Sequence, residues 1–366
     1  MCTGARRYVT SQGVENLSRR VTEFFAREPD GPDLIVGAIP FDRHATFALQ
    51  QPDAVHRASG GLPAGDPSPL PGWTLLSADA TQDYGQAVAA AVKLIEGAAA
   101  GDLEKIVLAR RIALSSESPV DINRIVRHLV RDRSIVAYAA PLPADTDGQS
   151  GYLVGATPEL LVSRYGDRVR SNPLAGTARR SENRAADESA AQRLLNSEKD
   201  QREHRAVVEA VLDSLAPYCR ELSVDQEAAL TSTASLWHLG TQIEGRLKDT
   251  SIPSVELAAA LHPTPAVCGQ PRDAARAAIR RLEPFERGFY SGAVGWQASS
   301  GDGEWYVAIR CAEVTDRRLY LYAGAGIVAG SDPVQETEET AGKFIAMLAA
   351  LGIDEQALKQ VLSDTL

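Results

Sequence analysis

Two kinds of hydrophobic pattern alternate along the chain and predict its helices and strands. Apolar residues that recur every three or four positions indicate helices. The segments with this pattern are Val14–Arg27, Ala80–Ala100, Arg124–Val130, Ala186–Ala216 and Pro333–Leu351. Short runs rich in β-branched residues predict strands. These runs are Leu34–Pro40, Lys105–Leu114, Ile135–Ala140, Tyr152–Ala156, Leu160–Arg164, Ser291–Gln297, Glu304–Glu313 and Arg318–Ile327.

The order of these segments indicates the class of fold. Strands come in adjacent groups and do not alternate strictly with helices, which favours antiparallel sheets with helices outside over a doubly wound parallel sheet. The stretch 60–72 is rich in proline and glycine and predicts a loop. A length of 366 residues suffices for one large or two ordinary domains.

Two of the predicted helices carry carboxylates in line with their apolar stripe. Asp200 and Glu203 are three residues apart on the longest helix, so they lie on nearly the same side of it. Glu336 and Glu339 repeat this spacing on the last helix, with Lys343 one turn further on. A single such helix is ordinary, because surface helices often have acids at the rim of the apolar face. Two helices with the same spacing indicate a site.

A cluster of inward carboxylates needs a cation, because several negative charges cannot stay ionised together in a poorly solvated site. Ligand sets made only of oxygen suit Mg²⁺ and do not suit zinc or copper. A bound metal would also attract an anionic substrate to a chain whose formal net charge is −10. The two acid pairs therefore predict a magnesium site.

Composition excludes several other classes of protein. The negative net charge is unsuited to binding nucleic acid, which needs a concentrated positive surface. No apolar run approaches the roughly 20 residues that cross a bilayer. The four cysteines are far apart and form no CxxC pair, which argues against zinc and against a disulfide framework. We expect a cytoplasmic monomer without a membrane or nucleic-acid partner.

The glycine-rich segment Ala323–Gly330 has the spacing GxGxxxG. This is one residue longer than the dinucleotide-binding fingerprint, and no acidic residue follows at the end of a next strand. A dinucleotide-dependent dehydrogenase is therefore disfavoured. Glycines at this position are better suited to letting backbone amides approach a ligand.

Short segments spread over nearly the whole chain form a recognisable series: Gly37–Asp42, Lys105–Arg110, Gly155–Leu161, Pro173–Arg180, Ser197–His204, Leu236–Leu239, Leu261–Ala266, Ile309–Cys311 and Ala323–Val328. Each is weak alone, but their order and spacing are specific. In this series the chain resembles the chorismate-utilising enzymes. The resemblance implies an α/β fold of the α+β type. It further implies a single large domain, residues 1–366, of two stacked, largely antiparallel sheets with helices outside, in which 1–72 is the more variable N-terminal part.

The resemblance also implies roles for individual residues. Lys105 matches the family's general base and Glu159 its general acid. The positions that match magnesium ligands or the acids accompanying them are Glu203, Glu339, Asp200 and Glu336. Positions that match substrate-binding residues are Gly176, Thr177, His238, Ala266, Tyr290, Arg310, Gly324 and Lys343. The acids inferred from helical spacing are the same four that the resemblance implies.

The implied chemistry is the isomerisation of chorismate to isochorismate. Water adds at C2 of the ring while the 4-hydroxyl leaves, so Lys105 has to be neutral to take a proton and Glu159 has to hold one to give away. Mg²⁺ would fix the ring carboxylate and act as a Lewis acid. The family's amine-adding members commonly have glutamine in place of Lys105, and aminodeoxychorismate synthases often have lysine in place of Ala175. Water addition is therefore favoured.

Alternatives within and outside the family remain open. Salicylate synthases share the lysine base, although they tend to be longer at the amino terminus, and the Trp237–Leu239 context is more like that of isochorismate synthases. Anthranilate-synthase-like amine addition is a further alternative. A catalytically inactive binding relative is disfavoured, because every position with a chemical role is filled. Whether the product feeds menaquinone or siderophore synthesis is open.

Overall fold

The computed structural model describes residues 1–9, 13–27, 31–56, 72–78, 81–99, 101–144, 150–225 and 227–350. The chain forms two compact units, and each is made of three separate segments. Unit 1 comprises Met1–Gly61, Thr157–Pro263 and Ser291–Ala308, and unit 2 comprises Leu62–Ala156, Thr264–Tyr290 and Ile309–Leu366. The predicted loop at 60–72 lies outside the described residues except for Gly72. A single domain over residues 1–366 stays a prediction.

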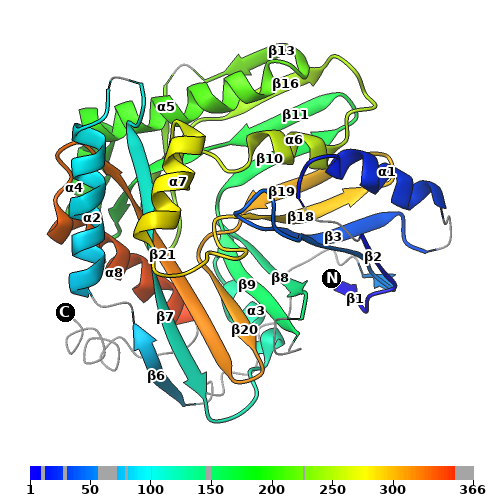
Figure 1. Cartoon of the computed structure of the whole chain (residues 1–366), viewed down its shortest axis with the longest axis horizontal. Helices are drawn as coiled ribbons and strands as arrows, with labels where there is room; N and C mark the ends of the chain where they lie inside the picture. The colour runs from blue at the N-terminus through cyan, green and yellow to red at the C-terminus, as the bar shows by residue number, and fades with distance from the viewer. Residues whose placement is uncertain are drawn as a thin grey trace. The chain divides into compact units, whose positions relative to one another are not determined.

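A large antiparallel sheet forms the framework of unit 1 (Figure 1). Its nine described strands, in spatial order, are β13 (Cys219–Val224), β16 (Ile243–Leu247), β11 (Arg168–Asn172), β10 (Leu160–Tyr165), β19 (Gly303–Val307), β18 (Ala293–Ala298), β3 (Leu34–Ile39), β4 (Ala48–Gln51) and β2 (Arg7–Val9). Every neighbouring pair is antiparallel. Two small sheets accompany it: β12 (Leu174–Arg179), β15 (Leu236–Gly240) and β14 (Ala229–Ser232) in one, β1 (Cys2–Thr3) and β5 (Ala54–Val55) in the other.

The helices described in unit 1 are α1 (Leu17–Arg27), α4 (Arg184–Leu195), α5 (Glu198–Leu215) and α6 (Ser254–Leu261). The apolar helix α6 packs on β10, β18 and β19, where the fully buried Trp305 donates its indole N–H to Ser254 Oγ at 3.2 Å. The expectation of one helix over Ala186–Ala216 is wrong, because the chain breaks into α4 and α5. Ser197 is the reason: its hydroxyl accepts a hydrogen bond from the Asp200 amide and caps a new helix.

Unit 2 is built on a second antiparallel sheet. Its described strands run in the order β17 (Gly269–Gln270), β7 (Lys105–Ser116), β21 (Arg318–Val328), β20 (Cys311–Thr315), β9 (Gly151–Thr157) and β8 (Val136–Leu142), and β6 (Trp73–Ala78) also pairs with β7. The two longest strands, β7 and β21, lie side by side from Lys105–Val328 to Ser115–Arg318 (Figure 1). Almost all of β7 is buried, and apolar residues lie on both sides of the central Arg110 and Arg111.

The helices described in unit 2 are α2 (Thr81–Glu96), α3 (Ile122–Leu129), α7 (Arg272–Leu282) and α8 (Pro333–Ala350). Side chains of α3 and α8, including Ile125, Leu129 and Phe344, form one apolar core with the strands β7, β9, β20 and β21. Helices α2 and α7 pack against β7. These arrangements confirm the predicted class of large antiparallel sheets accompanied by helices. None of the described helices is long and apolar enough to span a bilayer.

The prediction of one strand over Glu304–Glu313 is also wrong, because this segment contributes to two strands, β19 and β20. The two strands belong to different units. Arg310, between them, has a φ of +50°, a left-handed conformation that interrupts a regular strand and is uncommon for a residue other than glycine. Helices α6 and α7 and strands β1, β2, β4 to β6 and β11 to β17 were not predicted.

A buried carboxylate joins β12, β15 and α4 in unit 1. Asp187 accepts hydrogen bonds from Arg180 Nε (2.9 and 3.0 Å), the Ser181 amide (3.0 Å) and Trp237 Nε1 (3.0 Å). The Arg180 guanidinium also lies 4.2 Å from the centre of the Trp237 ring. The hydrogen bond from Arg180 is the main cause that lowers the pKa of Asp187 to about 2.

We predict that Asp187→Asn lowers the melting temperature at neutral pH and has little effect in acid. Because the pKa in the folded protein, about 2, lies below the ordinary value of 3.8, folding favours the charged form. The stabilisation is complete above about pH 5 and is lost as the pH falls through about 4 toward about 2. Calorimetry of wild type and variant across this range tests it. Asp213→Asn, at an exposed position of α5, is the control, and a difference that does not change with pH would contradict the assignment.

Candidate active site

Lys105 is the first residue of β7, and its side chain is buried. Its backbone lies between two strands, opposite Gln270 of β17 and Val328 of β21. Gly269 permits the close approach of β17: its φ is +130°, and a Cβ there would lie 2.2 Å from the Lys105 carbonyl oxygen. Only glycine tolerates this arrangement. The predicted base is therefore fixed at a strand end in the interior of unit 2.

Gly324, Tyr290 and Lys343 meet in unit 2. Lys343 Nζ donates hydrogen bonds to the Gly324 carbonyl oxygen (2.7 Å) and to Glu339 Oε1 (2.6 Å). A Cβ on Gly324 would lie 2.9 Å from the Tyr290 hydroxyl, so this position has no room for a side chain. The Tyr290 ring stacks on Tyr322, with 4.9 Å between ring centres.

The acid pair on α8 is less symmetric than its spacing predicts. Glu336 is buried, whereas the side chain of Glu339 is 39% exposed. The buried face of α8 is centred on Thr340, Phe344 and Met347, so Glu339 lies at its rim and the expectation that it points inward is wrong.

Glu336 and Glu339 both affect the pKa of Tyr84. Its pKa is raised well above the ordinary value, first by burial and then by the negative charges of Glu336 and Glu339. The nearby Arg110 opposes this shift, and its guanidinium lies 5.5 Å from the centre of the Tyr84 ring.

Two more predicted positions of unit 2 lie on turns. Arg310 adopts its left-handed φ directly before β20, and its carbonyl accepts a hydrogen bond from the Ala156 amide at 3.1 Å. A non-glycine residue in this conformation carries strain, which is common at functional sites. Ala266 is half-buried in a turn in which the Thr264 carbonyl accepts from the amides of Val267 (3.2 Å) and Cys268 (3.0 Å).

Glu159 lies in unit 1 between β9 and β10, and its side chain is buried. The backbone on both sides of it is held. Its amide donates to Thr157 Oγ1 at 3.2 Å, and its carbonyl accepts from the Val307 amide at 3.1 Å. The predicted acid is thus attached to a buried part of the large sheet.

Gly176, Thr177 and His238 meet where β12 is irregular. The register between β12 and β15 shifts between Ala175 and Thr177, and Gly176 at this bulge has a φ of +71°. The ring Nδ1 of the buried His238 is 3.3 Å from the Gly176 carbonyl oxygen and 3.4 Å from Thr177 Oγ1. The bulge therefore turns a backbone carbonyl and a hydroxyl toward the same imidazole.

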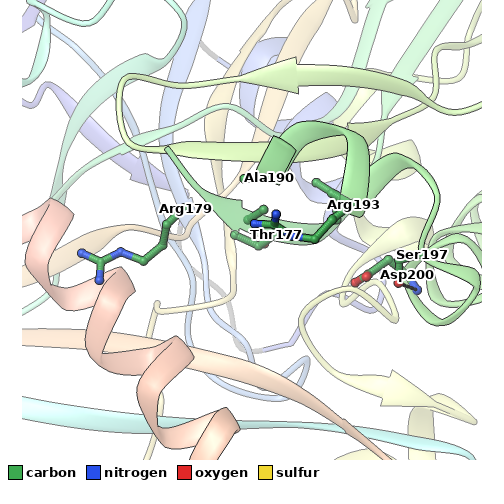
Figure 2. A pocket seen from close by; sticks show the side chains of 8 residues that line it. Thr177, Arg179, Ala190, Arg193, Ser197 and Asp200 are labelled. Carbon is green, nitrogen blue, oxygen red and sulfur yellow. Dashed lines mark hydrogen bonds between the residues drawn. The ribbon is translucent and has the colours of Figure 1, made fainter. Parts of the chain in front are cut away.

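The acid pair on α5 lies beside this bulge. Asp200 and Glu203 are both half-buried, and a Cβ on Gly176 would lie 3.2 Å from Asp200 Cβ. A pocket of about 410 Å³ opens here. Its lining is Thr177, Ala178, Arg179, Ala190, Arg193, Leu194, Ser197 and Asp200. Figure 2 shows Ser197 and Asp200 close together at the start of α5, whereas Arg179 points away from the other residues that it labels.

The structure also contains residues that the sequence reasoning missed. His204, in the predicted segment Ser197–His204, is buried and lies 2.7 Å from Thr241 Oγ1 through Nε2. Burial lowers its pKa to about 4, against the opposing effect of the Glu203 charge. Tyr84, Arg110 and the pair Glu283–Arg287 were missed as well. Arg110 lies in Lys105–Arg110, one of the segments that carry the family resemblance. The spacing of four residues between Glu283 and Arg287 could have predicted their ion pair.

Eight of the predicted residues thus form two groups, one in each unit, and Lys105, Glu159, Glu203, Ala266, Arg310 and Glu336 are not among these eight. In unit 1 the structure brings together Gly176, Thr177, His238 and Asp200, and in unit 2 Tyr290, Gly324, Lys343 and Glu339. The carboxylates come as pairs, and no cluster of three or more His, Cys, Asp or Glu residues suited to a metal occurs among the described residues. All four acids offer only oxygen, and this donor chemistry fits Mg²⁺.

Comparisons with known proteins agree with this picture. The family described as chorismate binding enzyme matches residues 66–352. An isochorismate synthase of Bacillus subtilis is 44% identical over 353 residues, which are 93% of this chain and 87% of the relative. A solved structure from Bacillus anthracis, assigned as a 2,3-dihydroxybenzoate-specific isochorismate synthase, has a TM-score of 0.88 at 40% identity and covers 96% of this chain and 93% of its own.

The menaquinone-specific isochorismate synthase of Escherichia coli is also similar in structure. Its TM-score is 0.76 at 25% identity, over 96% of this chain and 85% of the other. A shared fold alone does not give 44% sequence identity over a relative of nearly the same length. The family model also matches most of the chain. The chain belongs to the family of chorismate-binding enzymes.

Proposed function

We propose that this chain is an isochorismate synthase, which adds water at C2 of chorismate and releases the 4-hydroxyl. The observation that carries the proposal is the likeness to isochorismate synthases over more than nine tenths of the chain. The reaction forms one C–O bond and breaks another, and the ring double bonds shift between them. It therefore needs one group that takes a proton from water and one that gives a proton to the departing hydroxyl.

We assign the first role to Lys105 and the second to Glu159. Both side chains are buried, as expected of groups that act on a substrate in a site closed to bulk water. Ala175 supports the assignment to water addition, because a small apolar residue stands where aminodeoxychorismate synthases often have a nucleophilic lysine. Glutamine at position 105 would have indicated amine addition.

Chorismate carries two carboxylates, and unit 2 supplies cations suited to one of them. Lys343 is half-buried and already binds a carbonyl and a carboxylate oxygen. Its ammonium is therefore fixed in direction before substrate binds. Arg310 adds a second positive charge, and the carbonyl of Gly324 holds the Lys343 ammonium in place. We propose that these three residues bind a substrate carboxylate.

We propose Asp200, Glu203, Glu336 and Glu339 as the residues that would hold Mg²⁺. When bound, the metal would supply Lewis-acid stabilisation and neutralise the ring carboxylate. The negative charges of Glu336 and Glu339, which help to raise the pKa of Tyr84, support the proposal of a cation site here. Lys343 offsets part of that charge through its ion pair with Glu339.

We assign no pathway to the product, because relatives are named for both 2,3-dihydroxybenzoate and menaquinone. The isomerisation is the same for either route. We also propose that the protein is cytoplasmic and monomeric; the four free thiols support the location, because thiols stay reduced in that compartment.

Lys105→Ala is expected to lower kcat by about 10²–10⁴-fold, which is the usual contribution of a general base. Chorismate binding, measured by calorimetry, should stay within a few-fold of wild type. Lys93→Ala, at an exposed position of α2, is the matched control. Near wild-type turnover of the Lys105 variant would remove this lysine from the mechanism.

Removal of Mg²⁺ by a chelator is expected to abolish activity, and added Mg²⁺ to restore it. Glu339→Gln should weaken Mg²⁺ binding in calorimetric titration while the melting temperature without metal is little changed, since this side chain lies at the rim of α8. Glu338→Gln, an exposed neighbour, should bind as wild type does. Full activity in excess chelator would refute the metal assignment.

The choice of nucleophile tests the proposed function as a whole. With chorismate, Mg²⁺ and abundant ammonium at mildly alkaline pH, wild-type protein is expected to form mainly isochorismate, because Lys105 activates water and gives ammonia no comparable help. Lys105→Gln should lose most of this activity. Products are identified by chromatography. A mainly aminated product would assign an anthranilate or aminodeoxychorismate synthase, and salicylate with pyruvate would assign a salicylate synthase.

A further inference from the structure

Unit 2 contains a buried ion pair that none of the proposed roles uses. Glu283 comes directly after α7, and Arg287 lies four residues further along the chain. Each of the two side chains is 2% exposed. Arg287 Nε donates to Glu283 Oε2 at 2.8 Å, and Nη2 donates to Glu283 Oε1. Removing two charges from water costs more free energy than their attraction usually returns. Stability alone is therefore a poor explanation for this pair.

The pair takes the place of a missing strand along β7. On the edge away from β21, the described strand β17 pairs with Lys105 and Ile106, and β6 pairs only from Ile112 onward. Between them, Arg287 Nη2 donates to the Val107 carbonyl at 2.6 Å, and the Ala109 amide donates to Glu283 Oε1 at 2.8 Å. These side chains satisfy buried backbone groups that a neighbouring strand would otherwise bind.

The Arg287 side chain also contacts other parts of unit 2. Arg287 Nη1 donates to the Val267 carbonyl at 2.9 Å, and its guanidinium lies 5.8 Å from the centre of the Tyr290 ring. The Tyr290 amide in turn donates to the Arg287 carbonyl at 3.0 Å. One guanidinium thereby joins a strand, a turn and an aromatic ring.

Each of these contacts falls on or close to a proposed site residue. Val107 is two residues from Lys105, and Val267 follows Ala266. Ala109 lies opposite Gly324 in the pairing of β7 with β21. Tyr290 is contacted directly. An arginine with five donors in a rigid planar group is suited to hold several acceptors at once, and lysine is not.

We propose that Glu283 and Arg287 are positioning residues, which hold the start of β7, and so Lys105, against the turn that carries Ala266. This inference rests on the proposed role of Lys105 as the base. A displacement of a catalytic group by about 1 Å can cost about 10²-fold in rate. The pair therefore acts on catalysis through the geometry of Lys105 and does not itself contact the reacting atoms.

The test separates positioning from stability. Glu283→Gln leaves the buried guanidinium without a countercharge and should lower the melting temperature. The double variant Glu283→Leu/Arg287→Met removes both charges, but it also leaves the Val107 carbonyl and the Ala109 amide without these partners, so its melting temperature should stay below that of wild type. At a temperature at which circular dichroism shows both proteins folded, we expect its kcat to be at least tenfold lower than that of wild type. Wild-type kcat in the folded double variant would show a purely structural pair and overturn the proposal.

Arg287→Lys keeps the positive charge and serves if the double variant does not fold. Because an ammonium cannot reproduce the planar set of contacts, kcat should again fall at least tenfold, and wild-type kcat would overturn the proposal. Arg164→Met/Asp302→Leu is the control, since Arg164 and Asp302 form a largely buried ion pair in unit 1. It should change the melting temperature without a comparable loss of kcat, and an equal loss would show that any disrupted ion pair has this effect.

A double-mutant cycle with Lys105→Ala identifies the route of the effect. If the pair acts through Lys105, its replacement should cost little further kcat once the lysine is gone, so the two losses do not multiply. Fully multiplicative losses would overturn the positioning role while leaving the base assignment intact. If Lys105→Ala alone has no effect, the proposed function of Lys105 fails instead. The two failures are therefore distinguishable.

Discussion

The pairing of β7 with β21 is the constraint on which the rest of unit 2 depends. The register places Lys105 opposite Val328 and Gly324 opposite Ala109, and both strands are largely buried. A shift of one residue would reverse the direction of every side chain along β7. Lys105 can therefore occupy its interior position only in this register. The short strand β17 then secures the lysine from the other side, where Gly269 permits contact between the two backbones.

Charge in unit 2 is distributed around a few buried groups. Glu336 and Glu339 raise the pKa of Tyr84, and Arg110 opposes them. Lys343 binds Glu339 and the Gly324 carbonyl together. Buried or half-buried charges are costly without partners, and the half-buried Lys343 has such a partner in Glu339. The same arrangement leaves a cationic group and an acidic group next to each other, which suits a site for an anion and a divalent cation.

In unit 1, breaks in regular secondary structure determine where the polar groups lie. The bulge at Gly176 interrupts the regular alternation of β12, so that its carbonyl and the Thr177 hydroxyl both face His238. The end of β12 is tied to α4 and β15 through Arg180, Asp187 and Trp237. The start of α5 at Ser197 then sets Asp200 beside the bulge. Local breaks in secondary structure, each with its own hydrogen bonds, thus arrange the polar groups of unit 1.

Hydrophobic spacing by itself determined the class of fold, the strands β3, β7, β10 and β21 and the helix α8, because a buried face leaves its period in the sequence. It also marked the acid pairs on α5 and α8, and the resemblance supplied their assigned roles. Hydrophobic spacing did not show where two elements end, because a local cap at Ser197 divides one predicted helix and the left-handed backbone of Arg310 divides one predicted strand. The exposure of Glu339 and the backbone contacts of Glu283 and Arg287 could not be predicted either. They depend on which side of α8 meets the sheet and on a gap beside β7, and neither leaves a periodic signal in the sequence.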